Sequence, residues 1–148
     1  MEFDKEFLDK LFEQAMENPR LRQNFDLRTS SADTSQRMLN ALQPQTEVSI
    51  HRHEKTAETV ICLVGKLEEI IYEEVNEYVH EATSCCDDVI RQKSFKEVSR
   101  QVLSPAEGKF GIQIPAGAWH TINVIEPSVI FEAKDGAYNE FGNTTDKK

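Results

Sequence analysis

The sequence is short of basic residues and has no long apolar run, and each shortage excludes a class of protein. Its 17 lysines and arginines are outnumbered by 26 aspartates and glutamates, for a formal net charge of −9. Nucleic-acid binding depends largely on basic side chains that neutralise phosphates, and anionic membrane surfaces repel such a chain. No stretch approaches the roughly 20 apolar residues that span a bilayer, and the amino terminus is acidic, so we expect no secretion signal. These absences predict a cytoplasmic protein that binds neither nucleic acid nor membrane.

Cysteine is also scarce, and three cysteines cannot all pair with one another. Cys62 lies within an apolar run and is expected in the core. Cys85 and Cys86 are adjacent, which is poor geometry for a mutual disulfide. A thiol metal or redox site at this pair is the less favoured alternative. The pattern is typical of a reduced cytoplasmic protein.

Histidine is the scarce residue whose placement is most informative. Of the 4 histidines, all but one fall within two short segments, HRHEKTAETVICLVG at 51–65 and IPAGAWHTIN at 114–123. The remaining one, His80, lies in an acidic stretch and is expected at the surface.

The first segment contains three candidate metal ligands, which are two histidines and one glutamate. On a strand, His51 and His53 share a face about 6.6 Å apart along the chain, so both imidazoles can reach one cation. Glu58 follows His53 by an odd number of residues, and on an uninterrupted strand it would face away. It joins the histidines only if the polar residues 54–57 form a bend.

The second segment supplies the fourth candidate ligand, His120. Pro115 fixes its own backbone dihedral and Gly117 tolerates a positive φ, which favours a tight turn into a strand at 119–122. Three imidazoles and a carboxylate suit a divalent transition metal (Zn, Fe, Mn, Ni or Co) better than magnesium or calcium. The predicted ligands of this one metal ion are His51, His53, Glu58 and His120.

The two segments resemble the two sequence signatures of the cupin superfamily. The first reads HxH, four residues, Glu, six residues, Gly, and the second reads PxGxxH. Residues 1–141 are also similar to the cupin fold metalloprotein, WbuC family, through the N-terminal helix, QRMLNAL, HRHEKTAETV, PAGAWHT and EAKDGAY. The resemblance implies an all-β fold, the cupin double-stranded β-helix or jelly-roll barrel, with an N-terminal α-helix. It places a metal and a small-molecule ligand near one mouth of the barrel.

Hydrophobic periodicity predicts a single domain. An apolar stripe over 4–17 predicts a helix, and residues 20–35 are expected to be an irregular loop. Residues 1–35 should therefore pack as helix and loop on a barrel formed by residues 36–141. The polar residues 142–148 are expected to form a frayed tail.

Within the barrel, short apolar segments predict strands at 36–42, 60–64, 98–103, 112–114 and 129–133. Gly65 is expected to end the second of these strands, and residues 67–75 should follow as an edge strand with one wet side. From 76 to about 97 the pattern fails, which predicts an excursion from the barrel with room for a short helix.

Several further residues are candidates for a shell around the metal. Glu132 is the candidate catalytic acid–base residue if its strand points it inward; the alternative is a surface carboxylate. The candidate substrate-binding residues are Arg37, Tyr72, Trp119, Asn123 and Lys134. For Arg37 a solvated surface position is favoured by default, and the alternative is a contact with an anionic substrate at the barrel mouth. For Tyr72 and Trp119 core packing is favoured over a contact with substrate.

The sequence indicates a metal site more clearly than a reaction. The WbuC resemblance implies a link to surface-polysaccharide sugar pathways, and cupins include sugar isomerases and epimerases. This favours a metal-dependent isomerase or epimerase that acts on a small polar metabolite such as a sugar or nucleotide sugar. The alternatives are an iron-dependent dioxygenase and a non-catalytic metal-dependent binding module, so enzyme activity is left open. We expect a homodimer, with the helix stripe or an edge strand as its interface.

Overall fold

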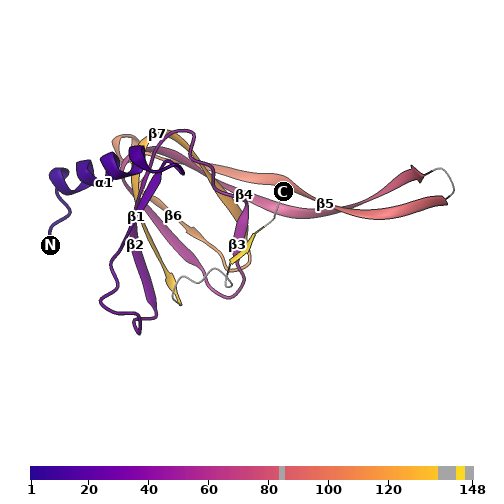
Figure 1. Ribbon diagram of the computed structural model, residues 1–148, viewed down its shortest axis with the longest axis horizontal. Coiled ribbons are helices and arrows are strands. Elements are labelled where there is room, and N and C mark those ends of the chain that lie inside the picture. The colour runs from indigo at the N-terminus through magenta and orange to yellow at the C-terminus, as the bar shows by residue number, and fades with distance from the viewer. Residues whose placement is uncertain (84–85, 137–142, 146–148) are drawn as a thin grey trace.

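The computed structural model describes residues 1–83, 86–136 and 143–145, which form an antiparallel β-fold with one N-terminal helix. Figure 1 shows a body of strands from which one long β-ribbon projects. The elements are α1 (Lys5–Glu17), β1 (Arg22–Asp26), β2 (Ser35–Leu42), β3 (His51–His53), β4 (Glu58–Thr83), β5 (Cys86–Leu103), the 3-10 helix η1 (Pro105–Glu107), β6 (Gly111–Ile114), β7 (Trp119–Asp135) and β8 (Asn143–Thr145).

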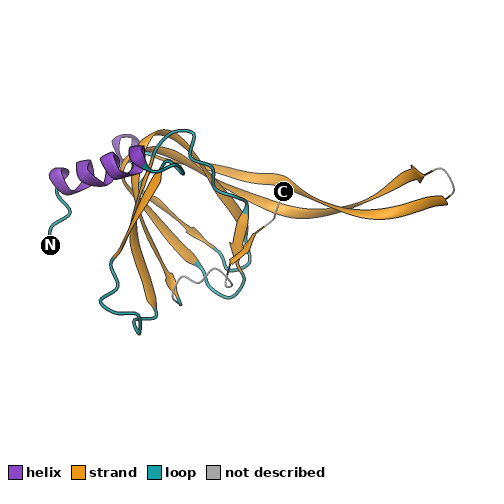
Figure 2. Cartoon of the chain, viewed as in Figure 1, coloured by secondary structure: helices purple, strands orange, loops and turns teal. Residues whose placement is uncertain are grey.

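Helix α1 confirms the predicted helix. The Asp4 side chain accepts a hydrogen bond of 2.9 Å from the Phe7 N–H and caps the first turn, and Asn18 caps the last. The apolar stripe of the helix packs on β1 and β2, and Figure 2 shows the helix beside the strands of the body. The buried members of this cluster are Leu11, Ala15, Leu39, Ala41 and Val129. The described residues contain no helix long and apolar enough to cross a membrane.

Strands β4 and β7 pair antiparallel over a long stretch. They belong to both layers of strands in the body, one that contains β2 and β6 and one that contains β3 and β5. Their register runs from Glu58 opposite Lys134 to Tyr72 opposite Trp119. At the first end the pair is flanked by β2 and β6, and at the other end by β3 and β5. Both strands therefore bend from one layer into the other, as strands do at the corners of a sandwich. This arrangement confirms the predicted all-β jelly-roll fold with an N-terminal helix.

The bend lies at Gly65, where the sequence predicts the end of a strand. The β4–β7 register shifts repeatedly between residues 62 and 67, and Gly65 has a φ of +95°. A Cβ on Gly65 would lie 2.2 Å from the Pro127 carbonyl oxygen, so only glycine fits. The predicted strand end is wrong because this glycine allows an irregularity within one strand instead of a turn. Before the bend an even-numbered residue of β4, Val60, points into the interior, and after it an odd-numbered residue, Glu69, does so.

An apolar cluster fills the interior next to this bend. Its buried members are Leu42, Val60, Cys62, Leu67, Leu103, Ile114, Val124 and Ile130. Cys62 is 2% exposed with a free thiol, as expected of a core cysteine. The side chains of His80, Cys85 and Cys86 lie outside the described part of the structure, so the predictions for them stay predictions.

Beyond Tyr72, β4 and β5 pair with each other and with no other described residue, and together they form the projecting ribbon (Figure 1). The predicted excursion at 76–97 is part of this two-stranded ribbon, and its described residues contain no helix. The stretch from Leu67 to Tyr72 is not an edge strand, because β5 and β7 flank it on either side.

Two short strands occur where the sequence predicts irregular chain. Strand β1 lies within the expected loop at 20–35 and pairs with β2. Its sequence, RQNFD, contains only one apolar residue, so hydrophobic alternation could not mark it. Strand β8 lies within the expected tail and pairs with β3; residues 142 and 146–148 of that tail lie outside the described residues.

Candidate metal centre

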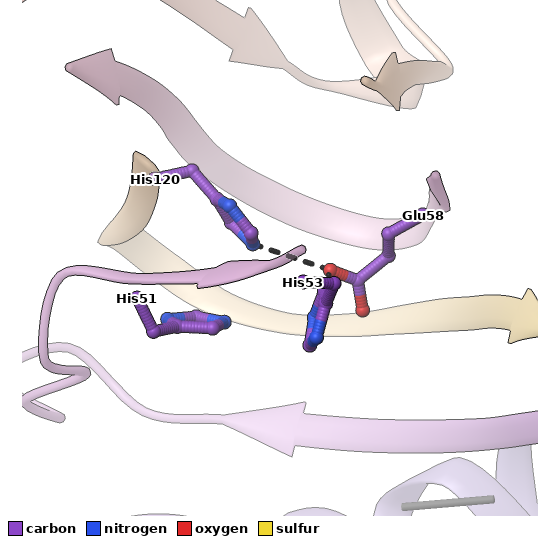
Figure 3. A group of neighbouring side chains, drawn as sticks. All are labelled: His51, His53, Glu58 and His120. Atoms are coloured by element: carbon purple, nitrogen blue, oxygen red, sulfur yellow. Dashed lines mark hydrogen bonds and ion pairs between the residues drawn. The ribbon is translucent and has the colours of Figure 1, made fainter. Parts of the chain in front are cut away.

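The four predicted ligand residues converge on one point (Figure 3). His51 and His53 come from β3, Glu58 opens β4, and His120 lies on β7 opposite His51. One potential ligand atom from each residue lies within 4.8 Å of those of the others. The bend at 54–57 turns Glu58 inward, as the odd spacing between His53 and Glu58 required.

The turn before His120 is tied to the strand that carries the other histidines. The Gly117 N–H donates a hydrogen bond of 2.8 Å to the His53 carbonyl oxygen, and the Ala118 N–H donates one of 3.2 Å to that of Pro115. Gly117 has a φ of +79°, as predicted for a tight turn. A backbone hydrogen bond therefore helps to hold the turn before His120 next to the strand of His51 and His53.

Backbone carbonyls orient two of the imidazoles. Nδ1 of His51 lies 2.9 Å from the Ser49 oxygen, and Nδ1 of His120 lies 2.9 Å from the Ala118 oxygen. A carbonyl oxygen can only accept, so each Nδ1 carries the proton and each Nε2 presents its lone pair. Metal-bound histidines typically donate their second ring N–H in this way.

Glu58 lies at the centre of the cluster. Its Oε2 is 3.0 Å from Nε2 of His53 and 3.2 Å from Nε2 of His120. Because Nε2 of His120 and a carboxylate oxygen are both acceptors, this contact requires a cation between them, either a proton or a metal ion. Together with the imidazoles and the carboxylate, it fits a divalent transition metal.

The protonation of these groups also suits ligation. Burial acts to raise the pKa of Glu58, but hydrogen bonds with His120 and His53 outweigh burial and hold that pKa well below its usual range. Burial, together with the neighbouring His120, lowers the pKa of His51 to about 4. At neutral pH Glu58 is therefore ionised and His51 is neutral, which are the forms that bind metals.

The cluster lies in the wall of a cavity of about 320 Å³. Much of the remaining wall is polar and comes from β1, β2, β4 and β7. The lining residues outside the cluster include Arg22, Asn24, Gln36, Met38, Asn40, Val60, Glu69, Ile122 and Glu132. A cavity of this size suits a small metabolite.

Glu132 points into this cavity, as its candidate role requires. It lies opposite Met38 of β2 and Val60 of β4 in the sheet register. Burial and the nearby Glu58 raise the pKa of Glu132 to about 8. Lys134 follows two residues later and faces the same side, but it is not part of the cavity lining, and its Nζ lies 3.4 Å from the Gly136 oxygen.

Arg37 and Asn123 face away from the cavity, so the structure does not support their predicted contact with substrate. Successive residues of a strand point to opposite sides, and it is the neighbours of these two residues that line the cavity. Arg37 instead forms an ion pair with Asp33. The Asn123 side chain donates a hydrogen bond of 2.8 Å to Glu68 on the exposed surface.

Trp119 and Tyr72 also lie outside the cavity, near the base of the ribbon. Trp119 is 3% exposed, and its ring centroid lies 4.8 Å from that of Phe95. The cationic groups of Arg52 and Lys93 lie 4.6 Å and 4.4 Å from the centre of the Trp119 ring. The Tyr72 ring centroid lies 6.4 Å from that of Phe95, so packing accounts for both aromatic residues.

Sequence reasoning missed several polar residues of the cavity wall, among them Gln36, Asn40 and Glu69. Glu69 is 1% exposed, and burial together with the charges of Glu58 and Glu132 raises its pKa well above the usual range. The clustered acids of β4 gave no hint that Glu69, and not its neighbour, faces inward. Gln36 and Asn40 share a face of β2, a period-two signal that was present in QRMLNAL.

Solved structures with a similar fold include three bacterial proteins. KdgF from Halomonas sp. is 13% identical with a TM-score of 0.52, and the match covers 84% of this chain and 87% of that one. A cupin-2 domain from Rhodospirillum rubrum is 12% identical with a TM-score of 0.51, and the match covers 86% and 66%. The capsular polysaccharide assembling protein CapF from Staphylococcus aureus is 16% identical with a TM-score of 0.50.

The match to CapF covers 80% of this chain but 27% of CapF, so this chain spans about a quarter of that protein. At such identities the likeness shows the fold alone, and that fold is the cupin fold. A comparison with curated proteins finds no match. The narrower resemblance to the WbuC family therefore stays a prediction.

One family model matches the chain, over residues 3–83, which are more than half of its length. The matched segment runs from α1 through β3 to the end of β4 and includes three of the four residues of the metal cluster. The chain therefore belongs to the family described as Domain of unknown function (DUF6016).

Proposed function

We propose that this chain is a metal-dependent cupin protein that isomerises or epimerises a small polar metabolite such as a sugar or nucleotide sugar. One observation carries the proposal: four potential metal-ligand atoms lie within 4.8 Å of one another in the wall of a cavity that Glu132 also lines. The resemblance to the WbuC family is the reason to test sugars of polysaccharide pathways first. The fold neighbour described as a capsular polysaccharide assembling protein is a second reason.

The residues divide the chemistry between them. A metal held by His51, His53, Glu58 and His120 would supply a Lewis acid that polarises a carbonyl group. Glu132 faces the same cavity, and in the metal-free protein burial and the nearby Glu58 raise its pKa to about 8, so its carboxyl group can hold a proton near neutral pH. A group with these properties can move a proton at the carbon next to a carbonyl.

Elemental analysis of protein purified without added metal tests the first half of the proposal. We expect about one equivalent of a divalent transition metal, because three histidines and one glutamate form a complete ligand set. His120→Ala should lose most of the metal. Asn123→Ala changes the outward face of the same strand and should keep it. Equal metal content in both variants would contradict the proposed ligand set.

Proton exchange in D₂O tests the second half. Metal-loaded protein would be incubated with ketohexoses and nucleotide ketosugars, and NMR would follow deuterium incorporation next to the carbonyl. We expect exchange by the wild type and exchange at least about 100-fold slower in Glu132→Gln, since the amide cannot take up the proton. Retained metal in the variant shows that the site is intact. No exchange with any of these sugars would remove the isomerase proposal.

The same cluster supports an iron-dependent dioxygenase as a second candidate, because its donor set also suits ferrous iron. Oxygen uptake by iron-loaded protein would favour this reaction. Tightly held zinc without oxygen consumption would eliminate it. Ligand binding without turnover, with a melting temperature that falls on chelation, would indicate a non-catalytic binding module.

We also propose that the chain forms a homodimer through the ribbon. Tyr78, Val89 and Ile90 are 71%, 56% and 45% exposed on this two-stranded element, which pairs with no other described strand beyond Tyr72. An isolated pair of strands is marginally stable in water, and its open edges can pair with the same edges of a second copy around a two-fold axis. Light scattering should show a dimer that Ile90→Lys dissociates and that Val98→Lys, nearer the body, leaves intact. A monomeric wild type at about 50 μM, well above the concentration at which stable homodimers dissociate, would refute this interface.

A further inference from the structure

Three buried oxygen atoms of the cavity wall have no hydrogen-bond partner among the described residues. They are Oε1 of Gln36, Oδ1 of Asn40 and Oε2 of Glu69. Gln36 is 4% exposed and Glu69 is 1% exposed. Folded proteins leave few buried polar atoms unpaired, because each one is destabilising. Three in one cavity indicate a ligand that supplies the missing partners.

The three atoms come from both layers of the fold. Gln36 and Asn40 lie four residues apart on the inner face of β2, with Met38 between them. Glu69 follows the Gly65 bend and lies opposite Ile122 of β7. Glu69 is also near enough to Glu58 and Glu132 for their charges to act on it. The unpaired atoms therefore surround the space next to the metal cluster.

The Asn40 side chain lies near Glu132 and acts to lower the pKa of that carboxyl group. Its Oδ1 has no hydrogen-bond partner among the described residues. At Asn40 the cavity therefore lacks a donor.

We propose that Gln36, Asn40 and Glu69 form a polyol-binding wall, which takes the hydroxyl groups of a sugar-like ligand whose other end reaches the metal centre. This inference rests on the proposed function, because it places the ligand in the same cavity, and it assigns that ligand a chemical class. A hydroxyl group both donates and accepts, so it can pair with the amide oxygens and with a glutamate in either protonation state.

Other ligand classes fit this wall less well. An apolar ligand would leave all three oxygen atoms buried and unpaired. An ammonium group can only donate, and it would lie near the divalent cation that the cluster is proposed to hold. The wall therefore favours neutral hydroxyl groups over both.

Three probes with the same six-carbon carboxylate skeleton test the inference on Co²⁺-loaded protein. D-Gluconate carries hydroxyl groups, hexanoate carries none, and 6-aminohexanoate carries an ammonium group. The visible spectrum of Co²⁺ reports whether the metal site is formed, and calorimetry measures the affinity of each probe. We expect gluconate to bind at least about tenfold more tightly than either of the other probes, since it gains several hydrogen bonds.

Variants of the wall residues test whether the preference for gluconate arises from these side chains. Gln36→Met and Glu69→Met remove oxygen atoms at nearly constant volume and should lose most of the gluconate preference with an unchanged Co²⁺ spectrum. Glu69→Gln keeps an oxygen atom and should retain part of it. Met38→Leu, an apolar change on the same wall, is the matched control and should retain all of it.

The stability of the ligand-free protein separates a binding role from a structural one. Removing a buried oxygen atom that has no partner should raise the melting temperature of Glu69→Met, by about 3 °C or more. A fall in melting temperature would show that Glu69 supports the fold, which overturns its proposed role.

The remaining outcomes are also decisive. A formed Co²⁺ site with no preference for gluconate, or with tighter binding of hexanoate or 6-aminohexanoate, overturns the polyol wall and leaves the metal centre standing. No Co²⁺ spectrum overturns the metal centre, and NMR titration of gluconate into the metal-free protein then decides on the wall by itself.

Discussion

Replacing Gly65 with alanine should destabilise the protein strongly, because two layers of the fold meet at this residue. A Cβ there would lie 2.2 Å from the Pro127 carbonyl oxygen, 2.4 Å from Ser128 Oγ and 2.7 Å from Ser128 Cα. The first and last of these are backbone atoms, which cannot rotate away. The φ of +95° adds a conformational penalty for any residue with a side chain.

The expected size of the effect has two parts. A positive φ in a non-glycine residue costs about 1–2 kcal/mol, and an overpacked contact costs about 1–3 kcal/mol more. Gly65→Ala should therefore lower the free energy of unfolding by about 2–5 kcal/mol. Gly108 provides a matched control, since its φ is +73° but no atom of the described residues beyond its two chain neighbours lies within 4 Å of the place that a Cβ would take. Gly108→Ala should lose only the conformational part.

Urea unfolding followed by tryptophan fluorescence measures both variants. The chain has 1 tryptophan, Trp119, which is 3% exposed and should report the loss of packing. Both variants would be measured at the same protein concentration and metal content, because either one changes apparent stability. Equal losses in the two variants would refute the steric argument, as would a loss below about 1 kcal/mol in Gly65→Ala.

Three further predictions concern the helix, the metal and pH. Asp4→Ala should lower the free energy of unfolding by about 1 kcal/mol in thermal melts, because the first turn loses its cap; Glu2→Ala is the control, and an unchanged stability would contradict the cap. Adding metal at about 1,000 times its Kd should stabilise the wild type by about 4 kcal/mol and leave His120→Ala unchanged, and a chelator should reverse the gain. In the metal-free protein the raised pKa of Glu132 favours the folded state when Glu132 is protonated, so its contribution is lost as the pH rises from about 4.5 to about 8. His51, with a pKa lowered from 6.5 to about 4, has an opposite effect that is nearly complete at pH 6.5 and is common to both proteins. Between pH 6.5 and 8, Glu132→Gln should therefore show a shallower decline than the wild type in chemical unfolding, and parallel declines would refute this assignment.

The metal cluster was predictable because its geometry is set by local rules. Spacing places His51 and His53 on one face, and a polar bend returns Glu58 to them. Pro115 and Gly117 predict the turn that presents His120. Each rule uses a few neighbouring residues, and the resemblance to the two cupin signatures supplied the expectation that the two segments meet.

Part of the cavity wall was missed, because two structural features reverse the usual rules. The apolar face of β2, with Leu39 and Ala41, packs under α1, so Gln36 points into the interior and Arg37 points away from it. A helix layered on the sheet makes the outer face the apolar one. The irregularity at Gly65 likewise changes which residues of β4 point inward, and no spacing argument that treats β4 as regular can find Glu69.

The excursion at 76–97 was predicted, but its two strands escaped prediction for a related reason. Hydrophobic alternation marks a strand only where one face is buried, and most described ribbon residues beyond Tyr72 are exposed. Strand β1 is similar, since Phe25 is its single apolar residue. The cytoplasmic location and the homodimer stay predictions.

The projecting ribbon also has a consequence for how the chain folds. Glu58 and His120 are 62 residues apart, and closing so long a loop costs entropy before any contact between them forms. The strands of a β-hairpin can pair progressively from its turn. Once Leu67 has paired with Leu103, the effective length of the loop between Glu58 and His120 falls to less than half. The saving is about 0.7 kcal/mol at the moment the two ends meet. The hairpin thus brings distant segments of the chain together early in folding.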